Sequence, residues 1–486
     1  MTQRHLGAAV APNDLLEPLR ALREELEIPE GFSAQAEADA EAAAGQPQPG
    51  QDFSVMPFVT IDPPGSMDLD QAVHLEPHGT GVRVRYAIAA VGRIVQPGSA
   101  LDAEVRARGV TVYGPGHSFP LHPRVLSADA ASLLPGAVRA AYLWTIDLDD
   151  AGAPVRTTVE LARVRSVARL TYDEVQGALD AGADLPGPVP AGFAALFERV
   201  GRLRQEVERE RGGVSLDIPE QIVERDDSGG YRLDFRGTAP AEGYNAQISL
   251  LTGMEAARLM REAGIGVFRT LPDAQDRDVQ RLRRCARALE LRWPAAMRYP
   301  DFVRSLDSSQ PTHAAFLDQA TSLFRGAGYE AFDGGAPDAP MPHGAIASEY
   351  AHVTAPLRRL VDRFGLEICL AHSQGSEVPE HVRAALPALP ETMAEATRRA
   401  NAYERGAVDV LEALVLQGRE GHEFAAVVVD VDDRPRTGGG RRGTVMLERP
   451  AVEAYVYGED LPIGEEVRVR LLEANPASRT VRFELA

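Results

Sequence analysis

Apolar positions follow two different periods along this chain, and the change from one to the other predicts how it is organised. In the first half they alternate, which predicts strands at residues 53–61, 82–89, 142–148 and 155–164. In the second half they recur every three to four residues, which predicts helices at about 245–262, 311–325, 356–371 and 390–416. Strands followed by helices are typical of an α+β domain, and we expect one over residues 52–418.

The two ends of the chain have patterns of their own. Leucines recur at helical spacing over residues 14–26, and an Ala/Glu stretch at 34–51 ends in Pro and Gly. We therefore expect residues 1–51 to form a short helical region and a linker. After Gly421 five short strand patterns follow closely, which predicts a five-stranded OB-type β-barrel over residues 419–486.

Composition narrows the possible chemistry. The formal charge of the 486 residues is −20, which argues against a surface that binds polyanions everywhere. All 51 basic residues are arginines, which bind phosphate through two parallel hydrogen bonds better than lysine does. The absence of lysine excludes a phosphate-binding loop ending in Gly-Lys and a Schiff-base lysine.

The chain also lacks the marks of an exported or membrane protein. Its two cysteines, Cys285 and Cys369, are far apart in sequence and form no Cys-x-x-Cys motif. No apolar run has the length of a membrane span, and the first residues lack a signal-peptide pattern. We expect a cytoplasmic protein without a membrane partner, and no feature points to a protein partner or to an oligomer rather than a monomer.

Three carboxylates lie in a Pro/Gly loop directly after the first predicted strand. Asp62 ends that strand, whereas Asp68 and Asp70 are two residues apart and would project to one side of an extended segment. Leu69 would then point into the core and anchor the loop. Mg²⁺ or Mn²⁺ would suit such oxygen ligands, and the alternative is a solvated acidic turn.

The residues of this loop carry a resemblance to a known family. Two segments, Thr60-Ile-Asp62-Pro and Asp68-Leu-Asp70-Gln71-Ala, are similar to the signature of the ribonuclease II/ribonuclease R family of 3′ to 5′ exoribonucleases. Further similar blocks extend the resemblance over most of residues 52–486. It implies an RNB-type catalytic domain, a mixed sheet or barrel with helices around an RNA channel, which hydrolyses single-stranded RNA stepwise to nucleoside 5′-monophosphates with Mg²⁺ or Mn²⁺.

The resemblance also implies roles for individual residues. Metal ligands would be Asp62, Asp68, Asp70 and Gln71, and Arg358 would offset charge on the reacting phosphate. The positions expected near RNA are Tyr113, Tyr172, Arg359 and Glu404 in the catalytic region, and Arg434, Arg436, Arg441 and Arg442 in a Gly/Arg loop of the barrel. Each has a plainer interpretation: the tyrosines as packing residues, Arg359 and Glu404 as partners in surface ion pairs, and the loop as merely solvated.

Some positions depart from the family pattern. Gln71 stands where the family has a fourth aspartate, so the site has one negative charge fewer. Asn245-Ala246-Gln247 lies close to where relatives carry two glutamates, and about fifty N-terminal residues are too few for the two cold-shock barrels of larger relatives. An active exoribonuclease is therefore expected, and the alternative is a catalytically weak or inactive RNA-binding regulator with the same fold.

Overall fold

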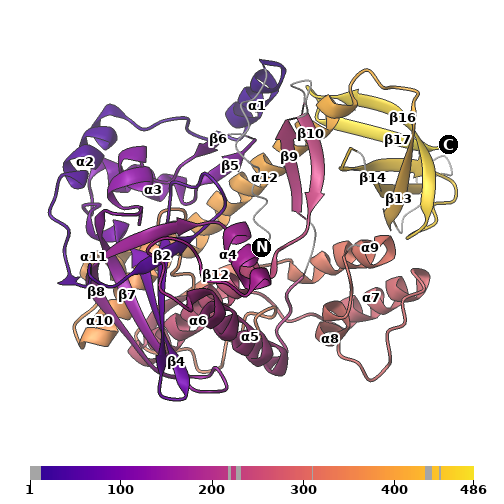
Figure 1. Ribbon diagram of the computed structural model, residues 1–486. Coiled ribbons are helices and arrows are strands. Elements are labelled where there is room, and N and C mark those ends of the chain that lie inside the picture. Colours follow the sequence, from indigo (N-terminus) through magenta and orange to yellow (C-terminus); the bar gives the residue numbers. More distant parts are fainter. Residues whose placement is uncertain are drawn as a thin grey trace.

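A mixed β-sheet that closes on itself forms the centre of the larger part of the molecule (Figure 1). The computed structural model describes residues 13–115, 117–216, 220–225, 231–308, 310–432, 441–447 and 450–486. The strand order is β1-β8-β2-β3-β4-β7, and β7 also pairs with β8. The strands are β1 (Gln51–Asp52), β2 (Phe58–Ile61), β3 (Gln71–His78), β4 (Gly81–Ala89), β7 (Val138–Leu148) and β8 (Pro154–Leu170).

Closure of the sheet depends on the length of β8. This strand has 17 residues; its first part, as far as Arg165, pairs antiparallel with β7, and its last part, from Ser166, pairs parallel with β2. One strand therefore joins the two ends of the sheet. The predicted pairing of residues 142–148 with 155–164 is confirmed. The strand predicted over 53–61 forms only from Phe58 onward, because residues 53–57 are a turn that joins β1 to β2.

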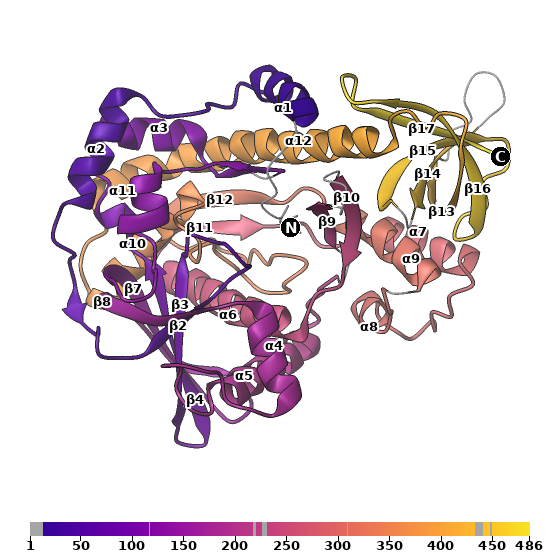
Figure 2. The ribbon, with the colours of Figure 1, turned by 45° about the horizontal axis from the view of Figure 1, so that its top comes forward.

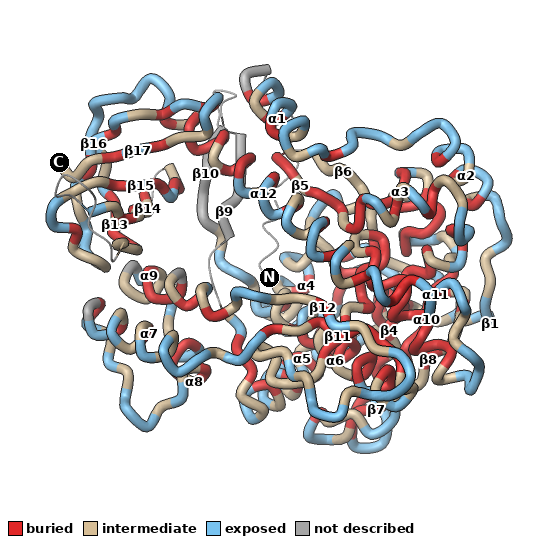
Figure 3. The backbone as a smooth tube through the Cα atoms, turned by 180° about the vertical axis from the view of Figure 1, so that it is seen from behind, coloured by how far each residue is buried: buried red, intermediate tan, exposed pale blue. Residues whose placement is uncertain are grey.

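Helices cover this sheet and bury most of its residues, as Figure 3 shows around α10 and α11. Helix α6 packs against α5 and α10, and α10 also contacts β8. The helices of this part are η1 (Val91–Arg93), α3 (Ala100–Arg108), the π-helical turn η2 (Leu126–Ala130), α4 (Tyr172–Ala181), α5 (Phe193–Arg211), α6 (Pro240–Ala263), α10 (Leu360–Gln374), α11 (Glu380–Ala385) and η4 (Leu386–Ala388). Strands followed by helices confirm the predicted α+β class.

Three two-stranded ribbons supplement the main sheet. They pair β5 (Val112–Gly114) with β6 (His117–Phe119), β9 (Glu220–Arg225) with β10 (Tyr231–Arg236), and β11 (Ile265–Thr270) with β12 (Gly328–Asp333). The first ribbon packs on α12 (Leu389–Leu416), the helix that runs from the sheet towards the C-terminal barrel in Figure 2. This helix confirms the pattern at 390–416 and ties the two parts of the molecule together.

The C-terminal part is a closed barrel with strand order β13-β14-β15-β17-β16, as predicted. Its strands are β13 (Glu423–Val431), β14 (Arg441–Leu447), β15 (Val452–Gly458), β16 (Glu466–Asn475) and β17 (Thr480–Leu485). The helices α7 (Asp276–Ala288), α8 (Tyr299–Arg304), α9 (Pro311–Ala320) and η3 (Thr321–Phe324) form a separate apolar cluster that includes Val429 of the barrel.

The N-terminal region departs from the prediction. Helix α1 (Asn13–Glu25) is present, but the expected linker begins with a second helix, α2 (Ala34–Ala44), whose Ala36, Ala40 and Ala43 are buried. The small side chains of these alanines let the helix lie close against α3, so this stretch is packed and not a free linker. Within the described residues no helix is both long and apolar enough to cross a membrane.

A glycine in α6 sets how closely this helix approaches the segment before α10. The Gly253 carbonyl accepts a hydrogen bond of 3.0 Å from Ala351 N, and a Cβ atom on Gly253 would lie 2.7 Å from Ala351 O and against the Tyr350 ring. Gly177 in α4 is also helical, but a Cβ there would meet nothing within 4 Å.

We expect Gly253→Ala to lower the free energy of unfolding by about 1–3 kcal/mol, because overpacking forces these backbones apart. Gly177→Ala should raise it by about 0.5–1 kcal/mol through helix propensity. Urea unfolding followed by circular dichroism measures both. Equal changes in the two variants would contradict the close approach at Gly253.

Candidate active site at the acidic loop

The loop of residues 62–70 is anchored at both ends and at one point between them. Asp62 directly follows the fully buried strand β2, and its N–H donates to Leu170 O on β8 at 3.0 Å. Leu69 is completely buried, as predicted, and its N–H donates to Ser132 Oγ at 2.9 Å. Ser132 in turn donates to Met67 O at 2.6 Å. The loop therefore has a fixed shape on its inner side.

A turn far away in the sequence completes the site. Asp70 is buried, and its Oδ1 accepts a hydrogen bond of 2.7 Å from Leu357 N, whereas its Oδ2 accepts one of 2.8 Å from Arg358 Nε. The helix predicted over 356–371 begins only at Leu360, so the Leu357 amide belongs to the turn before α10 and not to the first turn of a helix. That amide faces Asp70.

Burial controls the protonation of the acidic loop. It raises the pKa of Asp62 to about 7 and that of Asp70 to about 7, while the Arg358 charge opposes both shifts. The Asp68 charge raises both pKa values further, so the three carboxylates lie within electrostatic range of one another. Without a cation, Asp62 and Asp70 are partly protonated at neutral pH, and a bound cation would displace those protons.

The oxygen donors suit a hard divalent cation, although they do not form a preformed cage. Within the described ranges, no group of three or more His, Cys, Asp or Glu side chains is arranged to hold a metal ion as it stands. Carboxylate oxygens are nevertheless the ligands that Mg²⁺ and Mn²⁺ prefer, and each oxygen of Asp70 keeps a lone pair besides the one bound by Leu357 or Arg358. The donor chemistry of Asp62, Asp68 and Asp70 therefore fits the predicted metal.

Gln71 uses both ends of its amide within the protein. Its Oε1 accepts a hydrogen bond of 2.9 Å from the Tyr86 hydroxyl, which also lies 2.9 Å from Ser249 Oγ on α6. Its Nε2 donates to Thr354 O at 2.5 Å. Gln71 thus links β3, β4 and α6 to the segment that carries Arg358, and its role as a metal ligand stays a prediction.

The two predicted tyrosines both border the acidic loop. The Tyr113 hydroxyl on β5 lies 3.5 Å from Asp68 Oδ2, and Asn245 Nδ2 donates to the Tyr172 hydroxyl at 3.2 Å. Burial raises the pKa of each phenol above its ordinary value, and the Asp62 charge raises that of Tyr172 further. Their stacking on RNA bases stays a prediction.

The remaining predicted residues of the catalytic part lie on the segments around this site. Arg359 forms two hydrogen bonds with Asp362, of 2.9 and 2.8 Å, so it stabilises the start of α10. Glu404 lies on α12 next to Tyr403, whose hydroxyl is 2.8 Å from His117 Nε2 in the ribbon that contains Tyr113. Contact of Arg359 or Glu404 with RNA is untested.

The barrel contributes one feature that sequence reasoning missed. Arg434 and Arg436 lie outside the described residues, whereas Arg441 is exposed at the start of β14. Arg442 pairs with Asp432 at 2.7 Å and lies over the Tyr455 ring, 4.6 Å from its centroid. Tyr455 is 49% exposed, and it shares a strand face with Glu453, a two-residue spacing in the sequence that could have identified it as outward-facing.

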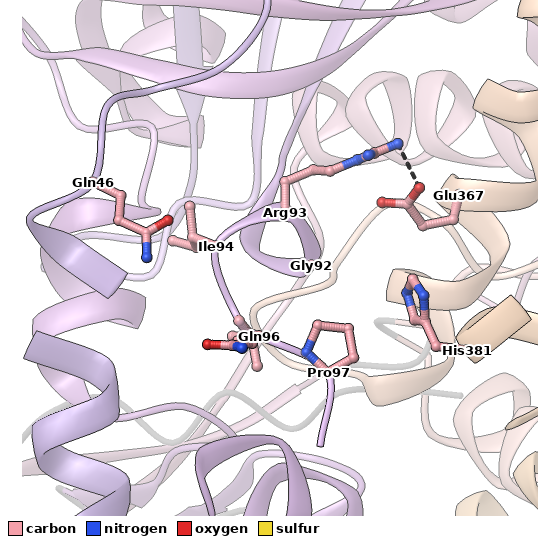
Figure 4. A pocket seen from close by; sticks show the side chains of 9 residues that line it. Gln46, Gly92, Arg93, Ile94, Gln96, Pro97, Glu367 and His381 are labelled. Carbon is pink, nitrogen blue, oxygen red and sulfur yellow. Dashed lines mark ion pairs between the residues drawn. The ribbon is translucent and has the colours of Figure 1, made fainter. Parts of the chain in front are cut away.

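A separate pocket of about 300 Å³ lies outside the acidic loop, and Figure 4 shows its lining. Its charged side chains already have partners, because Arg93 pairs with Glu367 at 2.6 Å and Tyr142 donates to the same carboxylate. No residue of the acidic loop or of the Arg358 turn lines it. The pocket is therefore separate from the acidic loop.

Fold and site together define an α+β domain with an acidic loop beside a partly buried arginine, followed by an oligonucleotide-binding type of barrel. The chain belongs to the RNB family: residues 50–366 match the RNB domain, and residues 422–486 match the RNase II-type exonuclease C-terminal S1 domain. Nucleases of this family are metal-dependent. The resemblance identified from the sequence is confirmed.

Individual relatives agree with this assignment. Ribonuclease R of Escherichia coli is 27% identical over 493 residues, covering 92% of this chain and 58% of the relative. Exoribonuclease 2 of Edwardsiella piscicida is 28% identical, covering 83% of this chain and 61% of the relative. This chain thus spans about three fifths of the length of these relatives.

A solved structure supports the fold. RNase R of Mycoplasma genitalium, in complex with ribose-methylated single-stranded RNA, matches with a TM-score of 0.84 and 19% identity. The match covers 98% of this chain and 78% of that one. At this identity the likeness establishes the architecture of the chain.

The Gln71 side chain bridges Tyr86 and Thr354 through two hydrogen bonds. We therefore expect that a glutamate, although of equal size, cannot replace this bridge. Gln71→Glu should lower the free energy of unfolding by about 1–3 kcal/mol, because it replaces the donor to Thr354 O with an oxygen and leaves that carbonyl unpaired. Thermal melting in EDTA tests this, with the same exchange at the exposed residue Gln280 of α7, Gln280→Glu, as the control. Equal melting of wild type and Gln71→Glu would contradict the bridge.

Proposed function

We propose that this protein is a metal-dependent 3′ to 5′ exoribonuclease, which hydrolyses single-stranded RNA stepwise to nucleoside 5′-monophosphates. The observation that carries the proposal is the pairing of Asp70 with Arg358 within a loop of three carboxylates. The Arg358 guanidinium lies beside the carboxylates that would hold the metal, where its positive charge would stabilise negative charge that develops during cleavage of a phosphodiester. Membership of the RNB family supports it.

Each residue of the site has a chemical task in this proposal. Asp62, Asp68 and Asp70 would hold Mg²⁺ or Mn²⁺, which when bound activates water and stabilises the leaving oxygen. Arg358 is only 18% exposed, so little solvent competes for its N–H groups. Its Nε is bound to Asp70, and the positive charge of its guanidinium group would offset negative charge on the scissile phosphate.

RNA would be held mainly through its bases and backbone near the 3′ end. Tyr113 and Tyr172 border the acidic loop and offer ring faces that accept any base. Arg359 and Glu404 are further candidate contacts. In the barrel, Arg441, Arg442 and the two residues of the loop outside the described ranges, Arg434 and Arg436, would follow the phosphate backbone of the incoming strand.

The first experiment is incubation of a 5′-labelled single-stranded RNA with the protein and Mg²⁺ or Mn²⁺. The wild type should yield a ladder that shortens from the 3′ end and releases monophosphates. Asp70→Asn should reduce the rate about 100-fold or more, because Arg358 loses its charged partner and the metal a charged ligand. Asp129→Asn, which alters an exposed carboxylate paired with Arg139, should keep the wild-type rate.

The same experiment decides between the two candidate functions. RNA that is bound tightly but stays intact with either metal would contradict hydrolysis and favour an RNA-binding regulator, consistent with the missing charge at Gln71. Cleavage of a DNA oligomer of the same sequence at an equal rate would contradict the RNA preference. Circular dichroism of Asp70→Asn separates lost chemistry from lost folding.

Tyr113 gives a test of base stacking that does not depend on the metal ligands. Tyr113→Ala should weaken binding of single-stranded RNA by about 1–3 kcal/mol, whereas Tyr113→Phe keeps the ring and should bind nearly as well as the wild type. Fluorescence anisotropy in EDTA measures both affinities. If the phenylalanine variant loses as much as the alanine variant, the hydroxyl beside Asp68 is responsible rather than the ring.

A further inference from the structure

A second arginine borders the acidic loop, and none of the roles described above uses it. Arg169 is the penultimate residue of β8 and pairs in register with Thr60 of β2, two residues before Asp62. Its side chain is exposed, in contrast to that of Arg358. The Arg169 charge also acts on Asp62, whose pKa it lowers against the larger effects of burial and of the neighbouring carboxylates.

The contacts of Arg169 fix its position without neutralising it. Its Nη1 donates to Ser66 O at 3.0 Å and lies 3.6 Å from Met67 Sδ. Both partners are uncharged. Among the residues that the structure describes, Arg169 forms no ion pair, although the loop that it contacts carries three carboxylates.

The loop is therefore held from two sides. Ser132 binds its inner side through Met67 O and Leu69 N, and Arg169 binds its solvent side through Ser66 O. A guanidinium group has five N–H groups in a planar fork, and the contacts with Ser66 O and Met67 Sδ both involve Nη1. Several donors with a full positive charge thus remain at the open edge of the site, next to Asp62.

We propose that Arg169 binds an internucleotide phosphate of the RNA strand, one linkage or more on the 5′ side of the scissile phosphate. The inference rests on one part of the proposed function, that RNA binds at this site. It does not require that the RNA is hydrolysed. An anionic oxygen suits the unused donors because charge-assisted hydrogen bonds to phosphate are the strongest that arginine makes. The contact with Ser66 O orients the guanidinium before RNA arrives, so less side-chain entropy is lost on binding.

The test compares binding of a short fluorescent single-stranded RNA to the wild type, Arg169→Gln and Arg165→Gln in EDTA. Arg165 is an exposed arginine on the same strand, whose charge acts on Asp52 rather than on the acidic loop. Arg169→Gln should bind about tenfold more weakly, and its plot of log affinity against log salt concentration should be flatter by about 0.7. Arg165→Gln should match the wild type.

A series of RNAs identifies the phosphate. Each carries one uncharged methylphosphonate, placed in turn at the linkages near the 3′ end. At one linkage the modification should weaken the wild type about tenfold and leave Arg169→Gln unaffected, because the charge that it removes has already lost its partner. Arg169→Lys keeps the charge and should restore most of the affinity.

Other outcomes would overturn the inference. If Arg169→Gln melts at a lower temperature and weakens every RNA equally, with an unchanged salt slope, Arg169 only supports the loop. Unchanged affinity, or a wild type that does not bind RNA, would also exclude the contact. Failure of the proposed function is distinguishable, since a wild type that binds RNA but does not cleave it still gives a readable methylphosphonate series.

Discussion

The buried carboxylate of Asp70 is the constraint on which the candidate site depends. A charged group taken out of water is strongly destabilising unless it is paired and hydrogen-bonded, and Asp70 meets this requirement with Leu357 N and Arg358 Nε. These partners lie 287 and 288 positions further along the chain. The acidic loop therefore reaches its low-energy state only when the sheet, α6 and α10 have brought the two segments together, which couples the chemistry to completion of the fold.

Gln71, the next residue, also bonds to the segment that carries Arg358, and there is a physical reason for its lack of charge. Asp70 already requires a cation and an N–H donor from the Arg358 turn, whereas the Thr354 carbonyl in the same segment requires a donor. An amide donates to that carbonyl and also accepts from Tyr86. A carboxylate could accept from Tyr86 but could not donate to Thr354 O. The departure from the family pattern thus removes one negative charge and adds a hydrogen bond to the segment that carries Arg358.

The sequence predicted the individual strands and helices better than the long-range contacts that bring the site residues together. Alternation and helical spacing predicted the strand at 82–89, the long helix at 390–416 and the barrel, because each buries one regular face. Period alone extended the helix at 356–371 back to Pro356, since it could not show that the Leu357 amide is required by Asp70. Local sequence also could not indicate a role for Arg169. Its position beside the acidic loop results from the parallel pairing of β8 with β2, which no local pattern encodes.

The net charge of −20 is compatible with an RNA substrate because charge acts over short distances in salt. At physiological ionic strength the screening length is about 8 Å, so acidic residues on distant surfaces repel the strand only weakly. What matters is the charge that a phosphate meets on its path. In the proposed function, an RNA strand would pass Arg169 at the open edge of the acidic loop and then Arg358 beside Asp70. Arg169 has no ion pair in the described residues, whereas Arg358 is held by Asp70. The outer arginine would attract a phosphate before the inner one acts on the scissile bond, and this order would let an acidic protein draw in a polyanion from its 3′ end.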